Sequence, residues 1–231
     1  MSDANGADRL LDRPIWSALT TRQSAVSLGG PDAKRMSADI GIFAASVDAS
    51  LDSLVALAAL VPAGGEIALM EAEESPLPPG LTVHKSALGW QMIAPTITPG
   101  EPAFEITTLT DADAPAMLAL ATLTEPGPFF PRTNTLGRFV GVKRDGRLVA
   151  MAGRRLSMSG HCEVSGVCTH PDHRGNGYAA GLMRVVARSI LAEGDTPILH
   201  AYASNRGATA LYETLGFALR REMHITILGR A

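Results

Sequence analysis

Residues 167–179 read VCTHPDHRGNGYA, and this stretch decides the expected fold. A β-rich run ends at Thr169, a short loop carries Gly175 and Gly177, and an apolar helical pattern follows over 182–191. A glycine-rich turn that opens a helix presents several backbone N–H groups to one point, at the positive end of the helix dipole. A side chain at either glycine would keep a ligand away from the backbone, so the stretch predicts a phosphate-binding loop.

Two glycines before a helix are also ordinary turn chemistry, because glycine is the usual residue of loops. Two nucleotide fingerprints are excluded: the chain has no G-x-x-x-x-G-K-S/T, and Ala180 stands where the third glycine of G-x-G-x-x-G would follow. A second element favours the phosphate loop over a plain turn. After a strand-like run at 196–203, residues 204–217 read SNRGATALYETLGF.

The two segments together resemble the GNAT superfamily of acetyl-CoA-dependent N-acyltransferases. The phosphate loop of that family reads R/Q-x-x-G-x-G/A, and residues 174–179 match it. Its later signature reads N-x-x-A-x-x-x-Y-x-x-x-G-F, and residues 205–217 match that as well. The order and spacing of the two motifs also fit, and the resemblance covers about residues 104–229, roughly half of the chain.

The resemblance implies an α+β fold of the GNAT type. Its central sheet is mixed but mostly antiparallel, is flanked by helices, and splays between the central strand and the next one. The sequence places the elements of this half as strands at 104–109, 138–144, 147–156, 162–169, 196–203 and 218–228, with a helix at 110–125 and another after the phosphate loop. Asp145-Gly146 predicts a hairpin between two of these strands.

The chain divides at a proline-rich segment, 95–102, which predicts an N-terminal part of residues 1–102 and a catalytic domain of residues 103–231. Before it, 51–61 reads as a helix with Asp48 and Ser50 as candidate caps, and 66–70 and 81–84 read as short strands. This order is similar to the glycine N-acyltransferase branch of the family, whose N-terminal half is a degenerate copy of the same fold. The alternative is an unrelated cap or dimerisation segment.

Direct transfer of an acetyl or small acyl group from acetyl-CoA to a primary amine, in a ternary complex, is the reaction that the resemblance implies. It also implies which residues hold acetyl-CoA. The strand contacts to the pantetheine arm are Val167, Cys168 and Thr169, the pyrophosphate loop is Arg174, Gly175, Asn176, Gly177, Tyr178 and Ala179, and Asn205 lies beside the arm.

Tyr212 is the candidate general acid. It follows Asn205 by seven residues, about two helical turns, so both project to the same side. A phenol with a pKa near 10 can donate a proton to a departing thiolate whose pKa is near 8.5. The alternative is a ring that only packs into the core.

Two residues compete for the role of general base. Strand alternation places Glu163 on the same face as Val167 and Thr169, while the alternative for this residue is a strand carboxylate in a salt bridge. His200 stands where the branch that acts on ribosomal-protein N-termini carries a glutamate, and an imidazole with a pKa near 6.5 can accept a proton. The alternative for His200 is a histidine satisfied within the sheet.

Charge and composition bear on the binding partners and the cellular compartment of the protein. A net charge of −3 argues against an obligate nucleic-acid or anionic-membrane partner, and no 18-residue apolar stretch exists to span a membrane. The N-terminus has no apolar run and carries Asp3, Asp8 and Asp12, so no signal peptide is expected. Cys162 and Cys168 are expected on one face of a strand, unsuited to a disulfide, which favours a cytoplasmic protein.

No metal is expected, because the resemblance explains the loop around His170 and His173 without one. A homodimer and a non-catalytic acyl-CoA sensor stay open, and the sequence does not identify the acceptor amine.

Overall fold

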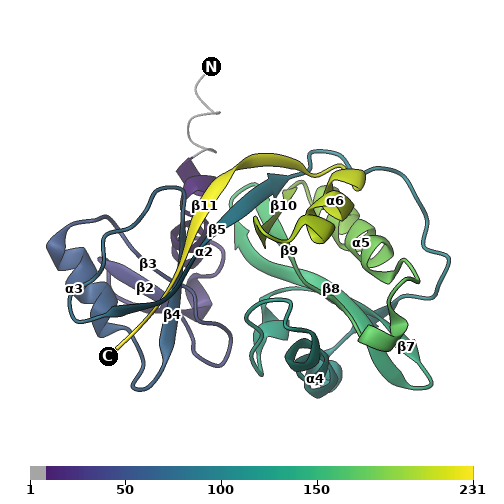
Figure 1. Ribbon diagram of the computed structural model, residues 1–231, viewed down its shortest axis with the longest axis horizontal. Coiled ribbons are helices and arrows are strands. Elements are labelled where there is room, and N and C mark those ends of the chain that lie inside the picture. The colour runs from purple at the N-terminus through teal and green to yellow at the C-terminus, as the bar shows by residue number, and fades with distance from the viewer. Residues whose placement is uncertain (1–8, 231) are drawn as a thin grey trace.

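The computed structural model describes residues 9–230 of the chain (Figure 1). Asp3 and Asp8, which helped to predict that no signal peptide is present, lie outside the described residues. Within residues 9–230, no helix is both long enough and apolar enough to cross a membrane.

Helices and strands alternate along the described chain in an α+β pattern. The α-helices are α2 (Pro14–Thr20), α3 (Leu51–Ala59), α4 (Ala114–Thr124), α5 (Tyr178–Ala192) and α6 (Arg206–Thr214). The 3-10 helices are η1 (Ser24–Val26), η2 (Asp111–Asp113), η3 (Thr133–Leu136) and η4 (Pro171–His173). The strands are β1 (Ser27–Gly29), β2 (Ala33–Met36), β3 (Ala44–Ser46), β4 (Glu66–Glu71), β5 (Thr82–Ile93), β6 (Thr107–Leu109), β7 (Phe139–Arg144), β8 (Arg147–Met158), β9 (His161–Thr169), β10 (Thr196–Tyr202) and β11 (Ala218–Gly229).

The predicted α+β fold is confirmed. Eight strands form one sheet in the order β4-β11-β5-β10-β9-β8-β7-β6, and β9 and β10 are its one parallel pair in the described chain. The predicted hairpin turn joins β7 and β8, where Asp145 and Gly146 both have positive φ, as a type I′ turn requires. A second sheet of β1, β2 and β3 lies in the N-terminal half.

Strands β9 and β10 separate soon after they meet. Their pairing joins 196–198 to 161–163 only, so that side of the β9 backbone is unpaired from 164 to 169 within the described structure. This is the splay that the family resemblance implied. It leaves backbone N–H and C=O groups along the end of β9 available to an extended ligand.

The sheet crosses the boundary predicted at residue 102. Strand β5 comes from the N-terminal half but lies between β10 and β11, and β11 in turn separates β5 from β4. Figure 1 shows these two long strands running from the lobe that contains α3 to the lobe that contains α5 and α6. The sequence predicted only a short strand at 81–84, whereas β5 has twelve residues. The two halves therefore share one hydrogen-bonded sheet.

A β-bulge in β9 corrects two expectations about which residues share a face. Gly166 has φ +61°, and the register with β8 shifts on this part of the strand. Before the bulge Cys162 packs in the core under α5, but beyond it Cys168 packs in the core under α4. The two thiols are free and lie on opposite faces. For the same reason Glu163, which alternates with Cys162, does not share a face with Val167.

The helix after the phosphate loop is fixed by burial of one apolar face. Leu182, Met183, Val186 and Ile190 are almost completely buried against the sheet. Burying each such side chain contributes about 1.5–3 kcal/mol. This packing holds the start of α5, and with it the loop before it, at the open end of β9.

Candidate active site

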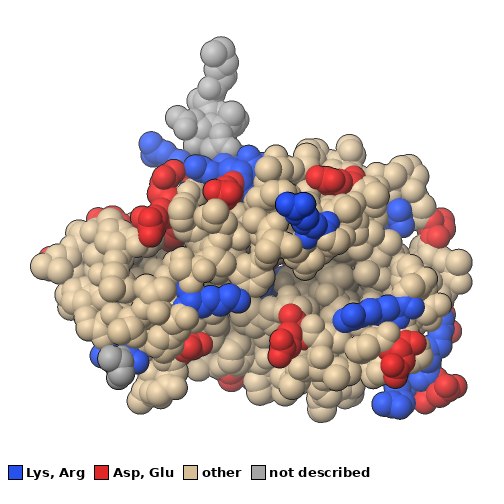
Figure 2. All heavy atoms as spheres, viewed as in Figure 1, with Lys and Arg blue, Asp and Glu red and all other residues tan. Residues whose placement is uncertain are grey.

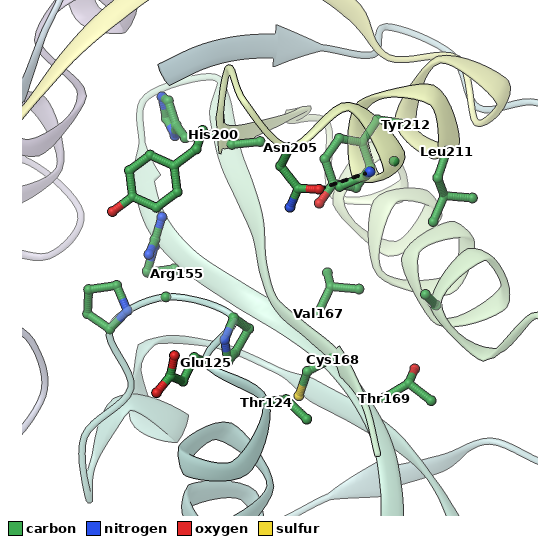
Figure 3. A pocket seen from close by; sticks show the side chains of 18 of the residues that line it. Thr124, Glu125, Arg155, Val167, Cys168, Thr169, His200, Asn205, Leu211 and Tyr212 are labelled. Carbon is green, nitrogen blue, oxygen red and sulfur yellow. Dashed lines mark hydrogen bonds between the residues drawn. The ribbon is translucent and has the colours of Figure 1, made fainter. Parts of the chain in front are cut away.

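One cavity of about 810 Å³ contains almost all the predicted site residues. It lies where β9 and β10 separate, and Figure 3 shows the side chains that project into it from β9, β10, α6 and the end of α4. Thirteen residues were predicted from the sequence, and twelve of them line the cavity: Val167, Cys168, Thr169, Arg174, Gly175, Asn176, Gly177, Tyr178, Ala179, His200, Asn205 and Tyr212. Glu163 is the exception.

The phosphate loop forms one end of the cavity. Gly175 and Gly177 have φ of +81° and +72°, and no heavy atom lies within 4 Å of the position that a Cβ would take at either residue. Gly177 is the N-cap of α5 and supplies no side-chain cap, so the first backbone N–H groups of this helix are free for an anion. The Asn176 side chain donates to the carbonyl of His173 (2.9 Å) and stabilises the turn.

Helix α6 presents Asn205 and Tyr212 to the same cavity (Figure 3). The Asn205 carboxamide oxygen caps this helix by accepting from the backbone N–H of Ala208 (3.2 Å). The Tyr212 ring is half-buried and packs edge-on against Phe217, with centroids 6.5 Å apart. Burial raises the pKa of the Tyr212 hydroxyl, so the group is protonated at neutral pH and can act as a proton donor.

Glu163 lies beneath the cavity wall and is completely buried. Arg155 binds both of its carboxylate oxygens, at 2.8 Å from Nε and 2.7 Å from Nη2, and the backbone N–H of Leu156 adds a third bond. Burial alone would raise the pKa of this carboxyl, but the charge and hydrogen bonds of Arg155 and the hydrogen bond with His200 hold it well below its ordinary range. The group is a fixed, ionised partner of Arg155.

His200 lines the cavity, yet both of its ring nitrogens are engaged inside the protein. Nδ1 lies 2.7 Å from a Glu163 oxygen and Nε2 lies 2.9 Å from the side-chain nitrogen of Gln91. The Gln91 nitrogen also donates to the carbonyl of Leu11, while its oxygen accepts from Arg220. Both ring nitrogens of His200 are therefore within hydrogen-bond distance of groups inside the protein.

These contacts make Glu163 and His200 parts of one buried network, with neither presenting a free lone pair to the cavity. Arg155 and Gln91 are the members that the sequence interpretation missed. A signal for Arg155 was present, because a charged residue inside a mostly apolar strand needs a buried partner. No such signal existed for Gln91, which meets His200 across β5 and β10.

Glu125 is a third residue that sequence reasoning did not single out. It ends α4 in the left-handed region, at φ +48° and ψ +53°, a conformation that costs energy for any residue with a Cβ. It is exposed and lines the cavity (Figure 3). A strained residue at the edge of a cavity is typical of a functional site.

Cys168 is not an activated nucleophile. Burial raises the pKa of its thiol to about 11, so the thiolate is scarce at neutral pH. Among residues 9–230, no group of three or more histidine, cysteine, aspartate or glutamate side chains is arranged to hold a metal ion.

Comparison with known proteins identifies the family. No curated protein matches the chain. A family model described as "FR47-like protein" matches residues 139–225. A structure from Novosphingobium aromaticivorans, assigned to the GNAT family of acetyltransferases, is 43% identical with a TM-score of 0.87, and the match covers 96% of this chain and 98% of that one.

Two more distant structures share the fold. A GCN5-related N-acetyltransferase from Kribbella flavida is 20% identical with a TM-score of 0.63, and the match covers 94% of each chain. A GCN5-related N-acetyltransferase-like protein from Streptococcus suis is 15% identical with a TM-score of 0.59, and the match covers 94% of this chain and 92% of that one. All three matches include the N-terminal half as well as the phosphate loop. The chain belongs to the GNAT family of acetyltransferases.

Proposed function

We propose that the protein transfers an acetyl or small acyl group from acetyl-CoA to a primary amine by direct attack in a ternary complex. One observation carries this proposal: a single cavity joins an uncapped, glycine-lined helix start, the unpaired edge of β9 and the hydroxyl of Tyr212. The helix start suits a pyrophosphate, and the unpaired edge of β9 suits an extended arm that bears amide groups. The Tyr212 hydroxyl can supply the proton that a leaving thiolate requires.

The reaction needs one bond made, one broken and two proton transfers. The amine nitrogen attacks the thioester carbonyl carbon, and a backbone N–H at the free edge of β9 polarises the carbonyl oxygen. The carbon–sulfur bond breaks as Tyr212 protonates the leaving sulfur. Because the nitrogens of His200 and the oxygens of Glu163 are already bonded, we assign removal of the amine proton to water in the cavity. Glu163 and His200 are then positioning residues that hold Arg155.

Thermal unfolding with acetyl-CoA is the experiment that tests the cofactor. A ligand at about 100 times its Kd stabilises a protein by roughly 2.7 kcal/mol. For a chain of this length that corresponds to a rise in Tm of about 5–10 °C. Adenosine diphosphate, which lacks the pantetheine arm, is the control and is expected to give a much smaller shift. Equal shifts with both, or none at millimolar acetyl-CoA, would contradict the assignment.

Replacing Tyr212 by phenylalanine is expected to lower kcat about tenfold and to leave the Kd for acetyl-CoA unchanged. The effect is modest for a general acid because a thiolate with a pKa near 8.5 is already a good leaving group. Steady-state kinetics with a saturating amine gives kcat, and calorimetry gives Kd. A wild-type kcat in this variant would remove Tyr212 from the mechanism.

A non-catalytic acyl-CoA sensor is the second candidate. The observation that favours it is that both bases predicted from the sequence, Glu163 and His200, are engaged within the wall. A turnover assay with a panel of primary amines separates the two candidates. Acetyl-CoA binding without turnover of any amine would support the sensor.

We also propose that residues 1–102 are a degenerate copy of residues 103–231, as the similarity to the glycine N-acyltransferase branch predicts. The topology supports this, because β3, α3 and β4 repeat the order of β9, α5 and β10, and an isolated parallel bridge joins Phe43, just before β3, to Ala68 in β4. The helix start in this half is capped by the Ser50 hydroxyl and has Asp48 beside it, so it does not suit phosphate. Two acetyl-CoA molecules bound per chain would contradict this assignment.

A further inference from the structure

The cavity continues past the catalytic region to a wall that the N-terminal half and β11 build. Six of the residues that line this part are apolar: Phe43, Ala68, Leu69, Met70, Ile225 and Ile227. All six are buried or half-buried. Figure 2 shows a hollow near the middle of this face, with Lys or Arg side chains above it and to its left and Asp or Glu below it. We refer to these six residues as the apolar wall.

Arg155 marks the place where the apolar wall meets the catalytic region. Its guanidinium carbon lies 4.7 Å from the centroid of the Phe43 ring, and its Nε and Nη2 bind Glu163. The remaining nitrogen, Nη1, has no hydrogen-bond partner within residues 9–230, although only 10% of the side chain is exposed. It lies beside Gly127, where an added Cβ would approach to 3.7 Å.

The charge of Arg155 is already balanced by Glu163, but its free N–H groups still need an acceptor. Nη1 faces the cavity, and a donor that loses water without gaining a partner is unfavourable. A ligand that fills this part of the cavity is therefore favoured if it brings an oxygen to Nη1. The apolar wall favours hydrocarbon at the same time. The two requirements together describe one ligand that carries both groups.

We propose that the apolar wall and Arg155 Nη1 form the acceptor subsite, and that it takes a primary amine bearing an apolar group and, next to the amino carbon, a carbonyl or carboxylate oxygen. This inference deepens the proposed function and rests on it. The apolar group packs on the wall, the oxygen accepts from Nη1, and the amino group points toward the open end of β9.

The hydrocarbon tail of a longer acyl thioester is the competing occupant of the apolar wall. It carries no acceptor atom for Nη1, so it would leave that donor unpaired as it passed Arg155. The phosphate loop also lies away from this wall: Figure 3 shows Arg155 and His200 on one side of the cavity and Thr169, at the start of the loop, on the other. The wall therefore belongs to the acceptor.

The test is a binding series measured by calorimetry on the full chain saturated with CoA, which cannot react. Glycinamide, alaninamide, leucinamide and phenylalaninamide differ only in the apolar group, and 3-methylbutylamine is leucinamide without its carboxamide. Each buried methylene is worth about fourfold in affinity, so leucinamide is expected to bind at least tenfold more tightly than alaninamide. Loss of the carboxamide is expected to weaken binding about tenfold or more.

Variants locate the subsite. Ile227→Thr is expected to remove most of the preference for leucinamide while glycinamide binding is unchanged. Leu219→Ala is the control on the same strand, because Leu219 is exposed and does not line the cavity. Should Ile227→Thr not fold, Ile225→Val removes a single methylene and is expected to reduce leucinamide binding about fourfold.

Equal affinities along the series would overturn the proposal. So would affinity for acyl-CoA that rises from acetyl through butyryl to hexanoyl while the amine makes no difference. Failure of the proposed function looks different. If the protein binds the amide series as expected but transfers no acetyl group, the subsite proposal stands and the proposed activity is refuted. If CoA does not bind, the series can be repeated without it.

Discussion

Gly177→Asp is expected to abolish detectable acetyl-CoA binding while the protein stays folded. The variant places a carboxylate at the first residue before α5, where the backbone N–H groups without a side-chain cap form the proposed pyrophosphate site. Two like charges about 4 Å apart near a protein surface repel by up to about 4 kcal/mol, and salt reduces this. We therefore expect a loss in affinity of roughly 100-fold or more, measured by calorimetry.

The controls separate this repulsion from backbone strain. Gly177 has φ +72°, so any side chain there costs about 1 kcal/mol in stability, and Gly177→Ala measures that cost alone. Gly160→Asp is the matched control, because Gly160 also has positive φ (+74°) and open space but lies in the turn between β8 and β9. Both controls are expected to bind acetyl-CoA. Normal affinity in Gly177→Asp would refute the loop assignment.

The conformation of the loop before α5 and its place in the cavity could be predicted because their determinants are local. Two glycines, a helix start and a following signature lie within 51 residues of one another, from Val167 to Phe217, and each acts through its own backbone conformation or spacing. The same holds for the Asp145-Gly146 hairpin, in which two positive φ values are needed at two adjacent residues. Local rules of this kind do not depend on which distant strand becomes a neighbour.

The faces of β9 could not be predicted by simple alternation, because a β-bulge at Gly166 inserts one extra residue into this strand. The sequence did contain a signal for this bulge, since a glycine inside a strand, such as Gly166, often marks one. Alternation without the bulge placed Glu163 beside Val167, whereas the bulge places it on the opposite face. The candidate base therefore turned away from the residues expected to hold acetyl-CoA, and the error came from a single positive φ.

Contacts between segments that are distant in the chain could not be predicted from the sequence either. The position of β5 between β10 and β11 puts Gln91 against His200, across 109 residues of chain. Phe43 meets Arg155 in the same way, across the predicted domain boundary. Nothing in the local pattern of either half specifies that its partner strand comes from the other half.

Glu163→Ala is expected to lower the free energy of unfolding by about 3–5 kcal/mol, because it leaves the Arg155 guanidinium buried without its counter-charge. For a chain of this length, this corresponds to a fall in Tm of about 6–20 °C. Glu101→Ala is the matched control: it removes an exposed glutamate from its pair with Arg188, and is expected to cost less than about 1 kcal/mol. Equal losses in the two variants would contradict the burial argument.

Two further measurements define the origin of this loss. Arg155→Met combined with Glu163→Leu is expected to regain at least half of the stability, because an apolar pair of similar size has no charge to desolvate. The pH dependence of the free energy of unfolding tests independently whether Glu163 stabilises the fold as an ion. The folded-state pKa of Glu163 is lowered, so its contribution is fully present above the unfolded value of about 4.3 and is lost as the pH falls from there through the folded value. Denaturant titrations below pH 5 are therefore expected to bring the wild type and Glu163→Ala closer together, and a gap that widens in acid would show that Glu163 is not held as an ion.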